Sequence, residues 1–401
     1  MEVFLVDFPL KVIQINNFLV SMNIVIIGPA YPYRGGLSAY NERLARAFEE
    51  AGHTVTIYTF SLQYPQFLFP GKSQFLEEKP TYELNIKRAV NSVNPLNWLK
   101  VGNEIKKLKP DFIICKYWLP FMGPAFGTIL RQAKKNKHTK VISILDNIIP
   151  HESRIGDKPF TKYFVKPIDG FISMSKKVHN DLSLFETQKP RLISPHPIFD
   201  NFGEMVTREE ALNYLKLDPK YNYMLFFGLI RDYKGLDLLL DAFAEKALKD
   251  KDIKLIIAGE YYTDKKPYLE LIEKYQLEDR IIQAEKFIQD SEVKYYFCAA
   301  DLVVQPYKTA TQSGVTQIAY HFNKPMIVTD VGGLKEMCPD GKVGYVVPVD
   351  KTLLAEAILK FFNENQQEKM IAHIKEEKKK YSWEILVENV FALHSKIESN
   401  Q

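Results

Sequence analysis

Short apolar runs alternate with longer amphipathic segments along most of the chain. An apolar run of about four to eight residues is typical of a strand buried on both faces, and the segments between such runs predict helices. The predicted strands of the first half are 22–28, 54–60, 111–115, 140–145 and 168–174, and those of the second half are 223–227, 253–258, 280–284, 301–305 and 326–329. This alternation predicts an α/β protein built from two doubly wound, Rossmann-like domains in series.

The length of 401 residues exceeds what one hydrophobic core usually supports, so it also favours two domains. Residues 1–21 are apolar but charged, and they lack the basic start and cleavage site of a signal peptide, so we interpret them as an extension. Two prolines near residue 196 and a fresh start of the pattern after residue 201 predict a boundary at about residue 200. We therefore expect domains at 22–200 and 201–380, followed by a terminal helix at 381–401.

Two regions of the first half lack the residue pattern of the predicted strands and helices. Residues 61–100 lack clear periodicity, so we expect a long connection that covers a site or touches a membrane. A basic cluster follows, with Arg131, Lys134, Lys135, Lys137 and His138 near Lys106, Lys107 and Lys109. Two interpretations of the cluster stay open: a solvated helix face, or a surface attracted to anionic lipid.

Composition narrows the class of protein. The 53 basic and 49 acidic residues leave a net charge of +4, which argues against a dedicated nucleic-acid binder. Cys115, Cys298 and Cys338 lie far apart without metal-ligand spacing, so we expect reduced thiols and no metal site. No apolar run is long enough to cross a bilayer. We expect a cytoplasmic protein that works either in solution or at the inner face of the membrane.

The stretch 226–240 combines a strand, a glycine, two cations and the start of a helix. Gly228 lets the backbone approach a ligand, Arg231 and Lys234 supply positive charge, and the next helix presents its positive N-terminal end. This combination predicts a phosphate-binding loop, although the spacing is not that of a Walker motif. The alternative is a solvated loop in which the two cations are incidental.

A second loop of the same predicted sheet, 306–315, has similar chemistry. Ser313 is a plausible N-cap. The N–H groups of Gly314, Val315 and Thr316 are expected to be free at the helix start, beside the side chains of Thr311 and Gln312. Two such loops at one carboxyl edge suggest a binding site for a diphosphate.

The first half also places polar residues at the carboxyl edge of its sheet. Gly35 and Gly36 lie in the loop after the first predicted strand, at the edge where doubly wound sheets bind ligands. Asp146, Asn147 and His151 follow the strand 140–145. These three side chains are suited to binding sugar hydroxyls or to handling a proton, and the alternative is a capped turn before a helix.

Four motifs in this order resemble the retaining glycosyltransferases of the GT-B fold, family-four type. They are GGLSAYNERLARAFEEAGHTV, NIIPHE, FGLIRDYKGLDLLLDAF and SGVTQIAYHFNKPMIVTDVGGLKE, and the resemblance extends from Met22 to the C-terminus. It implies an acceptor-binding first domain, a second domain that binds a nucleoside diphosphate sugar, a cleft between them, and a terminal helix that crosses back to the first domain. It also implies that Arg231 and Lys234 neutralise the donor diphosphate, and that neither a metal nor a cofactor is needed.

The chain departs from the family pattern at three places. Leu229 stands where many relatives have an arginine, so Arg231 would reach the diphosphate from two residues further on. Ala310 and Ile318 stand where relatives have two glutamates, and Thr311, Gln312, Ser313 or Gln317 would replace these carboxylates by hydrogen bonding. Asp146 stands where relatives often have histidine.

The resulting hypothesis is a sugar transferase of cell-surface polysaccharide or glycolipid synthesis. Its partners would be a nucleotide-sugar donor, a glycan or lipid-linked acceptor and, at most, a peripheral contact with anionic membrane, with no nucleic acid. Two alternatives remain: a non-catalytic protein that binds nucleotide sugars with the same fold, and a nucleotide-sugar epimerase or hydrolase. Transfer with retention of the anomeric configuration is what the resemblance implies.

Overall fold

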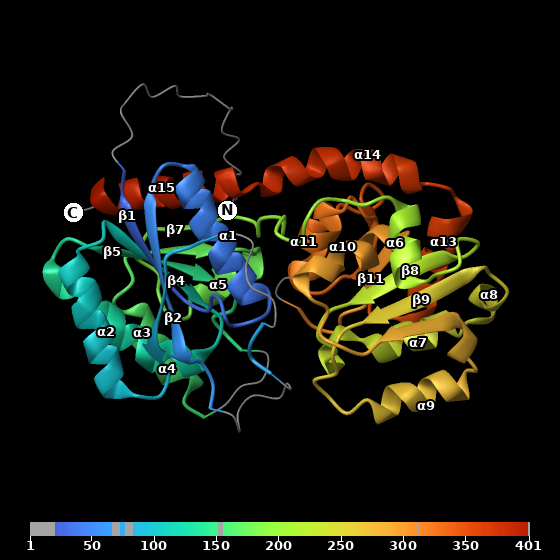
Figure 1. The fold of residues 1–401 in the computed structure, drawn as a ribbon, viewed down its shortest axis with the longest axis horizontal. Coiled ribbons are helices and arrows are strands. Elements are labelled where there is room, and N and C mark those ends of the chain that lie inside the picture. The colour runs from blue at the N-terminus through green and yellow to red at the C-terminus, as the bar shows by residue number, and fades with distance from the viewer. Residues whose placement is uncertain (1–20, 66–72, 77–82, 151–154, 311–312, 400–401) are drawn as a thin grey trace.

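The computed structural model describes residues 21–65, 73–76, 83–150, 155–310 and 313–399. Two α/β domains lie side by side, and helices cover both faces of each central sheet (Figure 1). All of the paired strands within the two sheets are parallel. The predicted fold class, with two doubly wound domains, is confirmed.

The first domain is built around a seven-stranded sheet with the order β3-β2-β1-β4-β5-β6-β7. Its elements are β1 (Asn23–Ile27), α1 (Gly36–Glu50), β2 (Thr54–Leu62), β3 (Ile86–Asn91), α2 (Pro95–Leu108), β4 (Phe112–Tyr117), η2 (Pro120–Met122), α3 (Gly123–Ala133), η3 (Lys134–Asn136), β5 (Lys140–Leu145), α4 (Asp157–Val165), β6 (Gly170–Ser173), α5 (Lys176–Leu182) and β7 (Arg191–Ile193).

The second domain contains a six-stranded sheet with the order β10-β9-β8-β11-β12-β13. Its elements are α6 (Arg208–Leu215), β8 (Asn222–Phe227), η4 (Asp232–Lys234), α7 (Leu236–Phe243), α8 (Lys246–Lys249), β9 (Ile253–Ala258), α9 (Lys266–Lys274), η5 (Glu278–Arg280), β10 (Ile281–Ala284), α10 (Asp290–Ala299), β11 (Leu302–Gln305), α11 (Gly314–His321), β12 (Met326–Thr329), α12 (Leu334–Met337), β13 (Gly344–Val347) and α13 (Lys351–Asn363).

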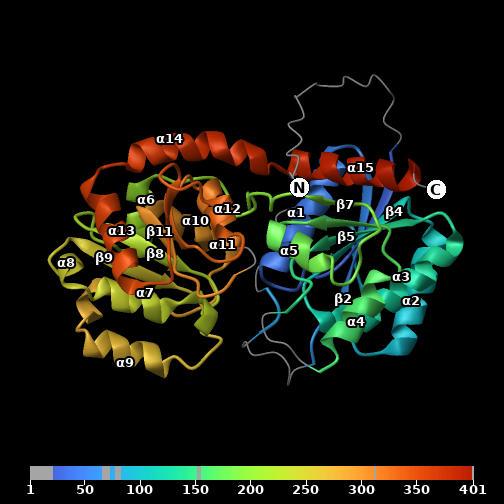
Figure 2. The same ribbon diagram turned by 180° about the vertical axis from the view of Figure 1, so that it is seen from behind.

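The chain passes between the domains twice. Residues 194–206 connect the sheets without a helix or strand, and the predicted boundary at residue 200 falls within this connection. The chain returns through α14 (Gln367–Glu377), η6 (Lys378–Tyr381) and α15 (Trp383–Ser399), which run along one side of both domains (Figures 1 and 2). Helix α15 packs on α1, β5 and β6, and the indole of Trp383 donates a hydrogen bond to the carbonyl of Ile198 at 2.8 Å. The last helix therefore contributes to the core of the first domain.

The prediction of a long irregular connection over 61–100 is wrong for its second part. Strand β3 pairs with β2 at the edge of the sheet, and α2 begins at Pro95. The side chain of Asn94 caps this helix by accepting hydrogen bonds from the N–H groups of Leu96 and Asn97. Residues 66–72 and 77–82 lie outside the described part of the chain, so the predicted role in covering a site stays a prediction for them.

The strand order determines where the two domains can bind a ligand. It reverses between β1 and β4 in the first sheet and between β8 and β11 in the second. In doubly wound sheets, ligands bind in the crevice at the carboxyl ends of the strands beside such a reversal. The loops after β1, β8 and β11 are those that carry Gly35, Gly228 and Ser313, so the sequence motifs lie at both reversal points.

Candidate active site

One cavity of about 530 Å³ joins the two domains. Residues predicted from the sequence line it from both sides: Gly35, Gly36, Asp146 and Asn147 from the first domain, and Gly228, Arg231, Lys234, Ser313, Gly314 and Val315 from the second. His151, Thr311 and Gln312 lie outside the described residues, so their predicted roles stay predictions. The predicted site residues that lie within the described part of the chain therefore all line this one cavity.

The two predicted phosphate loops of the second domain contact each other directly. Gly235 has φ 69°, and a Cβ placed there would overlap the carbonyl group of Pro306 in the other loop. The N–H of Lys308 also donates a hydrogen bond to the carbonyl of Tyr233 at 2.7 Å. Glycine at 235 therefore permits the close approach that places both loops at one cavity.

Lys234 has the unusual position of a buried cation in the cavity wall. Its residue is 9% exposed, and its ammonium lies 3.1 Å from where a Cβ on Gly228 would be. Burial, and then the charge of Arg231, lower the pKa of Lys234 from 10.5 to about 8. Within the described part of the chain, neither cation forms an ion pair with a carboxylate. Two adjacent cations that form no ion pair with any described carboxylate make this wall suited to bind an anion.

The second loop begins α11 as predicted, with one correction. The hydroxyl of Ser313 accepts a hydrogen bond from the N–H of Val315 at 3.2 Å, so the predicted N-cap is confirmed. The prediction that the N–H of Val315 is free for a ligand is wrong, because the cap uses it. A Cβ on Gly314 would lie only 2.8 Å from the ring of Phe199, which comes from the connection between the domains. Gly314 therefore lets the helix start approach that connection.

On the first-domain side, Gly35 precedes α1 with φ 101°, a conformation that favours glycine. Asp146 and Asn147 follow β5 directly and lie in the cavity wall. Asp146 forms an ion pair with Lys116, with 3.0 Å between Nζ and Oδ1. Lys116 was not among the residues predicted from the sequence, although a lysine that follows the apolar run 112–115 near the end of a strand is itself a signal.

An ion pair that was not predicted from the sequence joins the two domains. Arg34, just before Gly35, donates to the carboxylate of Glu260 at 2.6 Å, and both side chains are at most 10% exposed. The guanidinium of Arg34 also lies over the ring of Phe287 at 4.3 Å. Glu260 and Phe287 both line the cavity, so this contact between the domains lies at its wall. Glu260 follows the predicted strand 253–258 by two residues, and this position at the carboxyl edge of the sheet is the sequence feature that could have indicated a site residue.

The departures from the family pattern have visible consequences. Leu229 and Ile318 lie in the cavity wall as apolar side chains, and Ala310 is buried. Of the replacements suggested by the sequence, Ser313 lies in this wall. Gln317 is 1% exposed, and its amide group has no hydrogen-bond partner among the described residues, but it does not line the cavity. Position 318 therefore offers no carboxylate to a sugar or ribose.

The described residues contain neither a candidate metal site nor a candidate membrane span. Among the described residues there is no group of three or more His, Cys, Asp and Glu side chains that could hold a metal ion. The three cysteines are free and buried. In the same part of the chain, no helix is both long enough and apolar enough to cross a bilayer. Activity without a metal stays a prediction.

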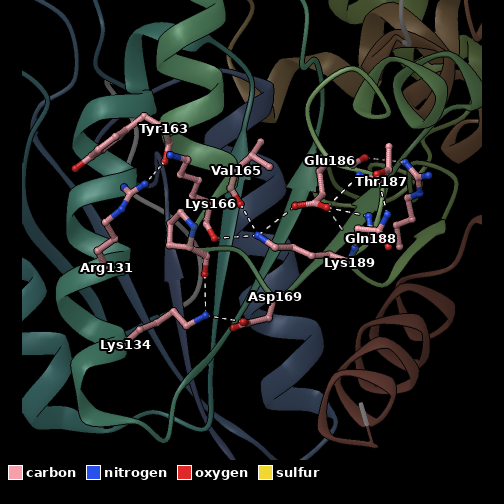
Figure 3. Close-up of polar contacts among 12 residues, drawn as sticks. Arg131, Lys134, Tyr163, Val165, Lys166, Asp169, Glu186, Thr187, Gln188 and Lys189 are labelled. Carbon is pink, nitrogen blue, oxygen red and sulfur yellow. Dashed lines mark hydrogen bonds and ion pairs between the residues drawn. The ribbon is translucent and has the colours of Figure 1, made fainter. Parts of the chain in front are cut away.

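A second cavity, of about 430 Å³, lies on the first domain, and we call it the basic cavity. Its lining residues are Arg131, Lys134, Lys135, Lys137, Lys166 and Pro167. Some of its cations are already engaged (Figure 3): Lys134 pairs with Asp169 at 2.5 Å, and Arg131 donates to the carbonyl of Tyr163 and lies over its ring. Lys135 and Lys137 form no ion pair with described residues. Net positive charge therefore remains at this surface.

Both domains match known protein families. Residues 34–195 match the model described as Glycosyltransferase Family 4, and residues 221–364 match the model described as Glycosyl transferases group 1. A similar curated protein is an uncharacterized glycosyltransferase of Methanocaldococcus jannaschii, with 25% identity, 94% of this chain covered and 99% of that protein. A lipopolysaccharide 1,2-N-acetylglucosaminetransferase of Salmonella typhimurium is 26% identical, over 40% of this chain and 45% of that protein.

Solved structures share the fold. A sucrose-phosphate synthase from Thermosynechococcus elongatus superposes with a TM-score of 0.72 at 17% identity, covering 94% of this chain and 100% of that chain. Anabaena HepE in complex with UDP superposes with a TM-score of 0.68 at 14% identity, covering 94% and 99%. The fold and the two family matches, one in each domain, define the class of the protein. The chain is a glycosyltransferase with the GT-B fold.

Proposed function

We propose that the protein transfers a sugar from a nucleoside diphosphate sugar to a glycan or lipid-linked acceptor, with retention of the anomeric configuration. One observation carries this proposal: Arg231 and the buried Lys234 line a cavity between the domains without a carboxylate partner among the described residues. Two cations match the charge of a diphosphate, and a buried ammonium interacts with phosphate more strongly than an exposed one.

The proposed chemistry uses the two walls of the cavity differently. Arg231 and Lys234 stabilise the diphosphate as it departs and gains charge, which lowers the barrier only if the contact strengthens in the transition state. The bond between the anomeric carbon and the diphosphate oxygen breaks, and the acceptor oxygen bonds to the anomeric carbon from the same face while its proton passes to the departing diphosphate, so the configuration is retained. On the other wall, Asp146 and Asn147 orient hydroxyl groups of the acceptor or the sugar. No step in this scheme needs a metal ion.

Relatives support the choice of substrates. Structures of Anabaena HepE contain UDP, UDP and glucose, or UDP-glucose. The names of two curated relatives refer to lipopolysaccharide. They are the lipopolysaccharide 1,2-N-acetylglucosaminetransferase already described and a lipopolysaccharide core biosynthesis mannosyltransferase of Rhizobium meliloti. We therefore propose cell-surface polysaccharide or glycolipid synthesis as the setting, on the cytoplasmic side.

Thermal unfolding with UDP, GDP, ADP and dTDP tests the donor site. A ligand at a hundredfold excess over its Kd stabilises the native state by about 2.7 kcal/mol, which for domains of this size shifts Tm by roughly 5–10 °C. We expect one nucleotide to produce such a shift, with the same result in EDTA. Absence of a shift with all four nucleotides would contradict the proposal.

Product analysis separates transfer from the alternatives. Transfer yields a new glycoside, hydrolysis yields free sugar, epimerisation yields an isomeric nucleotide sugar, and a pure binding protein yields none of these. The apolar side chain of Ile318 in the cavity wall is the observation that favours the binding protein as the second candidate. We expect a glycoside, and nucleotide binding without any product would favour that second candidate.

We further propose that the basic cavity contacts anionic membrane. Lys135 and Lys137 carry charge without ion pairs to described residues, and Tyr163 of α4, whose ring lies under the guanidinium of Arg131, is 38% exposed. Cations beside exposed aromatic side chains are typical of surfaces that bind anionic lipid. We expect co-sedimentation with phosphatidylglycerol vesicles that Lys135→Glu/Lys137→Glu weakens and Lys379→Glu/Lys380→Glu does not. Equal binding to neutral phosphatidylcholine vesicles would contradict this proposal.

A further inference from the structure

Lys116 is one of the most deeply buried cations of the described chain. It is 1% exposed and lies near the end of β4, in a strand whose residues 112–115 are apolar. Strand β4 pairs with β5 in a register that places Lys116 beside Ile144, two residues before Asp146. The Lys116 ammonium therefore reaches the carboxylate of Asp146, with 3.0 Å between Nζ and Oδ1.

Aromatic rings surround Lys116, and its ion-pair partner among the described residues is Asp146. Its ammonium lies 3.0 Å from the ring centroid of Tyr40 on α1, and the ring of Tyr40 packs on the imidazole of His196. Burial, and then the charge of Lys116, lower the pKa of His196 to about 3, so this imidazole is neutral at pH 7. Burial lowers the pKa of Lys116 itself to about 8, and Asp146 opposes that shift.

Stability alone does not account for this pair. Removing two opposite charges from water costs about as much as their attraction returns, and apolar side chains of similar volume are often at least as stable. The pair is also asymmetric, because the side chain of Asp146 is 12% exposed at the cavity wall whereas that of Lys116 is 2% exposed behind it. The ammonium of Lys116 therefore contacts one carboxylate oxygen of Asp146 from behind the cavity wall.

We propose that Lys116 is a positioning residue, which holds the carboxylate of Asp146 ionised and oriented toward the hydroxyl group that it binds during sugar transfer. The inference rests on the proposed function, because it assigns a role within the same reaction. Lys116 itself does not line the cavity and does not contact the donor site on the other domain. Donor binding and transfer should therefore respond differently to its removal.

Three variants test the proposal: Lys116→Met, Asp146→Asn and the double variant. Lys116→Met removes the ammonium that pairs with Asp146, so we expect kcat to fall by about a hundredfold, as for a misplaced reacting group, while Kd for the nucleoside diphosphate changes less than about twofold. Asp146→Asn should have a similar effect. The double variant should regain thermal stability without regaining activity. Lys324→Met, which removes a partly buried lysine outside the cavity, is the matched control and should retain wild-type kcat.

The pH profile separates positioning from a purely structural role. A cation about 3 Å away favours the ionised form of a carboxyl group by about one to three pH units. In Lys116→Met, the acid limb of kcat/KM should therefore move to higher pH by about that amount. The acid limb is the diagnostic one, because the pKa values of Lys116 and Lys234 are both lowered to about 8 and both affect the alkaline limb.

The outcomes are distinct. Loss of activity in Lys116→Met with an unchanged acid limb, and recovery of activity together with stability in the double variant, would overturn the positioning role while leaving the transferase function in place. Wild-type kcat in Lys116→Met would also overturn it. A wild-type protein that forms no glycoside with any donor would refute the proposed function, and the positioning role with it.

Discussion

Replacing Lys234 by methionine should abolish sugar transfer without lowering the stability of the protein, whereas most substitutions of buried residues lower it. Burial and the charge of Arg231 lower the pKa of Lys234 from 10.5 to about 8. At about 1.4 kcal/mol per pH unit, the difference between the two pKa values means that the charged ammonium destabilises the native state by roughly 3 kcal/mol at pH 7. Methionine has a similar length and no charge. We therefore expect the free energy of unfolding of Lys234→Met to be unchanged or to rise by at most roughly 3 kcal/mol.

Nucleotide binding should suffer in the same variant. A hydrogen bond to a charged group contributes about 1.5–3 kcal/mol, and each 1.4 kcal/mol is a factor of ten in affinity. We expect Kd for the nucleoside diphosphate to rise by about ten- to a hundredfold, and sugar transfer to be lost. Isothermal titration calorimetry measures Kd, and urea unfolding followed by circular dichroism measures stability. Lys308→Met is the control, because Lys308 pairs with Asp237 at the surface and does not line the cavity.

Two results would refute this reasoning. If Lys234→Met bound the nucleotide as tightly as the wild type, the ammonium would not contact the diphosphate. If the variant were destabilised by several kcal/mol, the ammonium would have a favourable partner in the folded protein, and the interpretation of its lowered pKa would be wrong.

Three further predictions follow from the same geometry. Bound diphosphate favours the charged form of Lys234, whose pKa is about 8 in the free protein, so nucleotide affinity should fall above pH 8 and calorimetry in several buffers should detect proton uptake on binding. The free energy of unfolding without ligand should rise between about pH 8 and 10.5, because in this range the unfolded chain holds more protons at Lys234 than the native state does. A decrease in this range would contradict the lowered pKa of Lys234. Arg34→Met should break the ion pair with Glu260 and increase the radius of gyration in small-angle scattering. Arg46→Met, which removes a partly exposed ion pair within α1, should not. Equal profiles for Arg34→Met and the wild type would show that the Arg34–Glu260 pair does not hold the domains together. EDTA should leave kcat unchanged, and a strict requirement for a divalent cation would contradict the proposed mechanism.

The central strands could be predicted because both of their faces are buried. Strands β5, β9 and β12 have the bounds expected from their apolar runs, 140–145, 253–258 and 326–329. Strand β3 was missed because it lies at the edge of its sheet, where most of its residues are exposed or half-buried and no apolar run results. Helix α2 was missed for a related reason, since Leu96 and Leu99 are 78% and 44% exposed and obscure the helical pattern.

The candidate site could be predicted as far as each motif determines its own loop. Gly228, Lys234 and Ser313 lie where the strand-to-helix pattern placed them, because a loop that follows a parallel strand reaches the carboxyl edge of its sheet. The pairs Lys116–Asp146 and Arg34–Glu260 could not be predicted in this way. The first depends on the register between β4 and β5, and the second joins residues of different domains, so neither is set by local sequence.

The anomeric configuration of the product tests the central claim most directly. The protein would be incubated with the nucleotide sugar whose nucleotide stabilises it and with a glycan or lipid-linked acceptor, and the product would be examined by proton NMR. We predict a new glycoside with the anomeric configuration of the donor. A glycoside of inverted configuration would contradict the proposed mechanism, and free sugar or an isomeric nucleotide sugar as the sole product would contradict the transferase function itself.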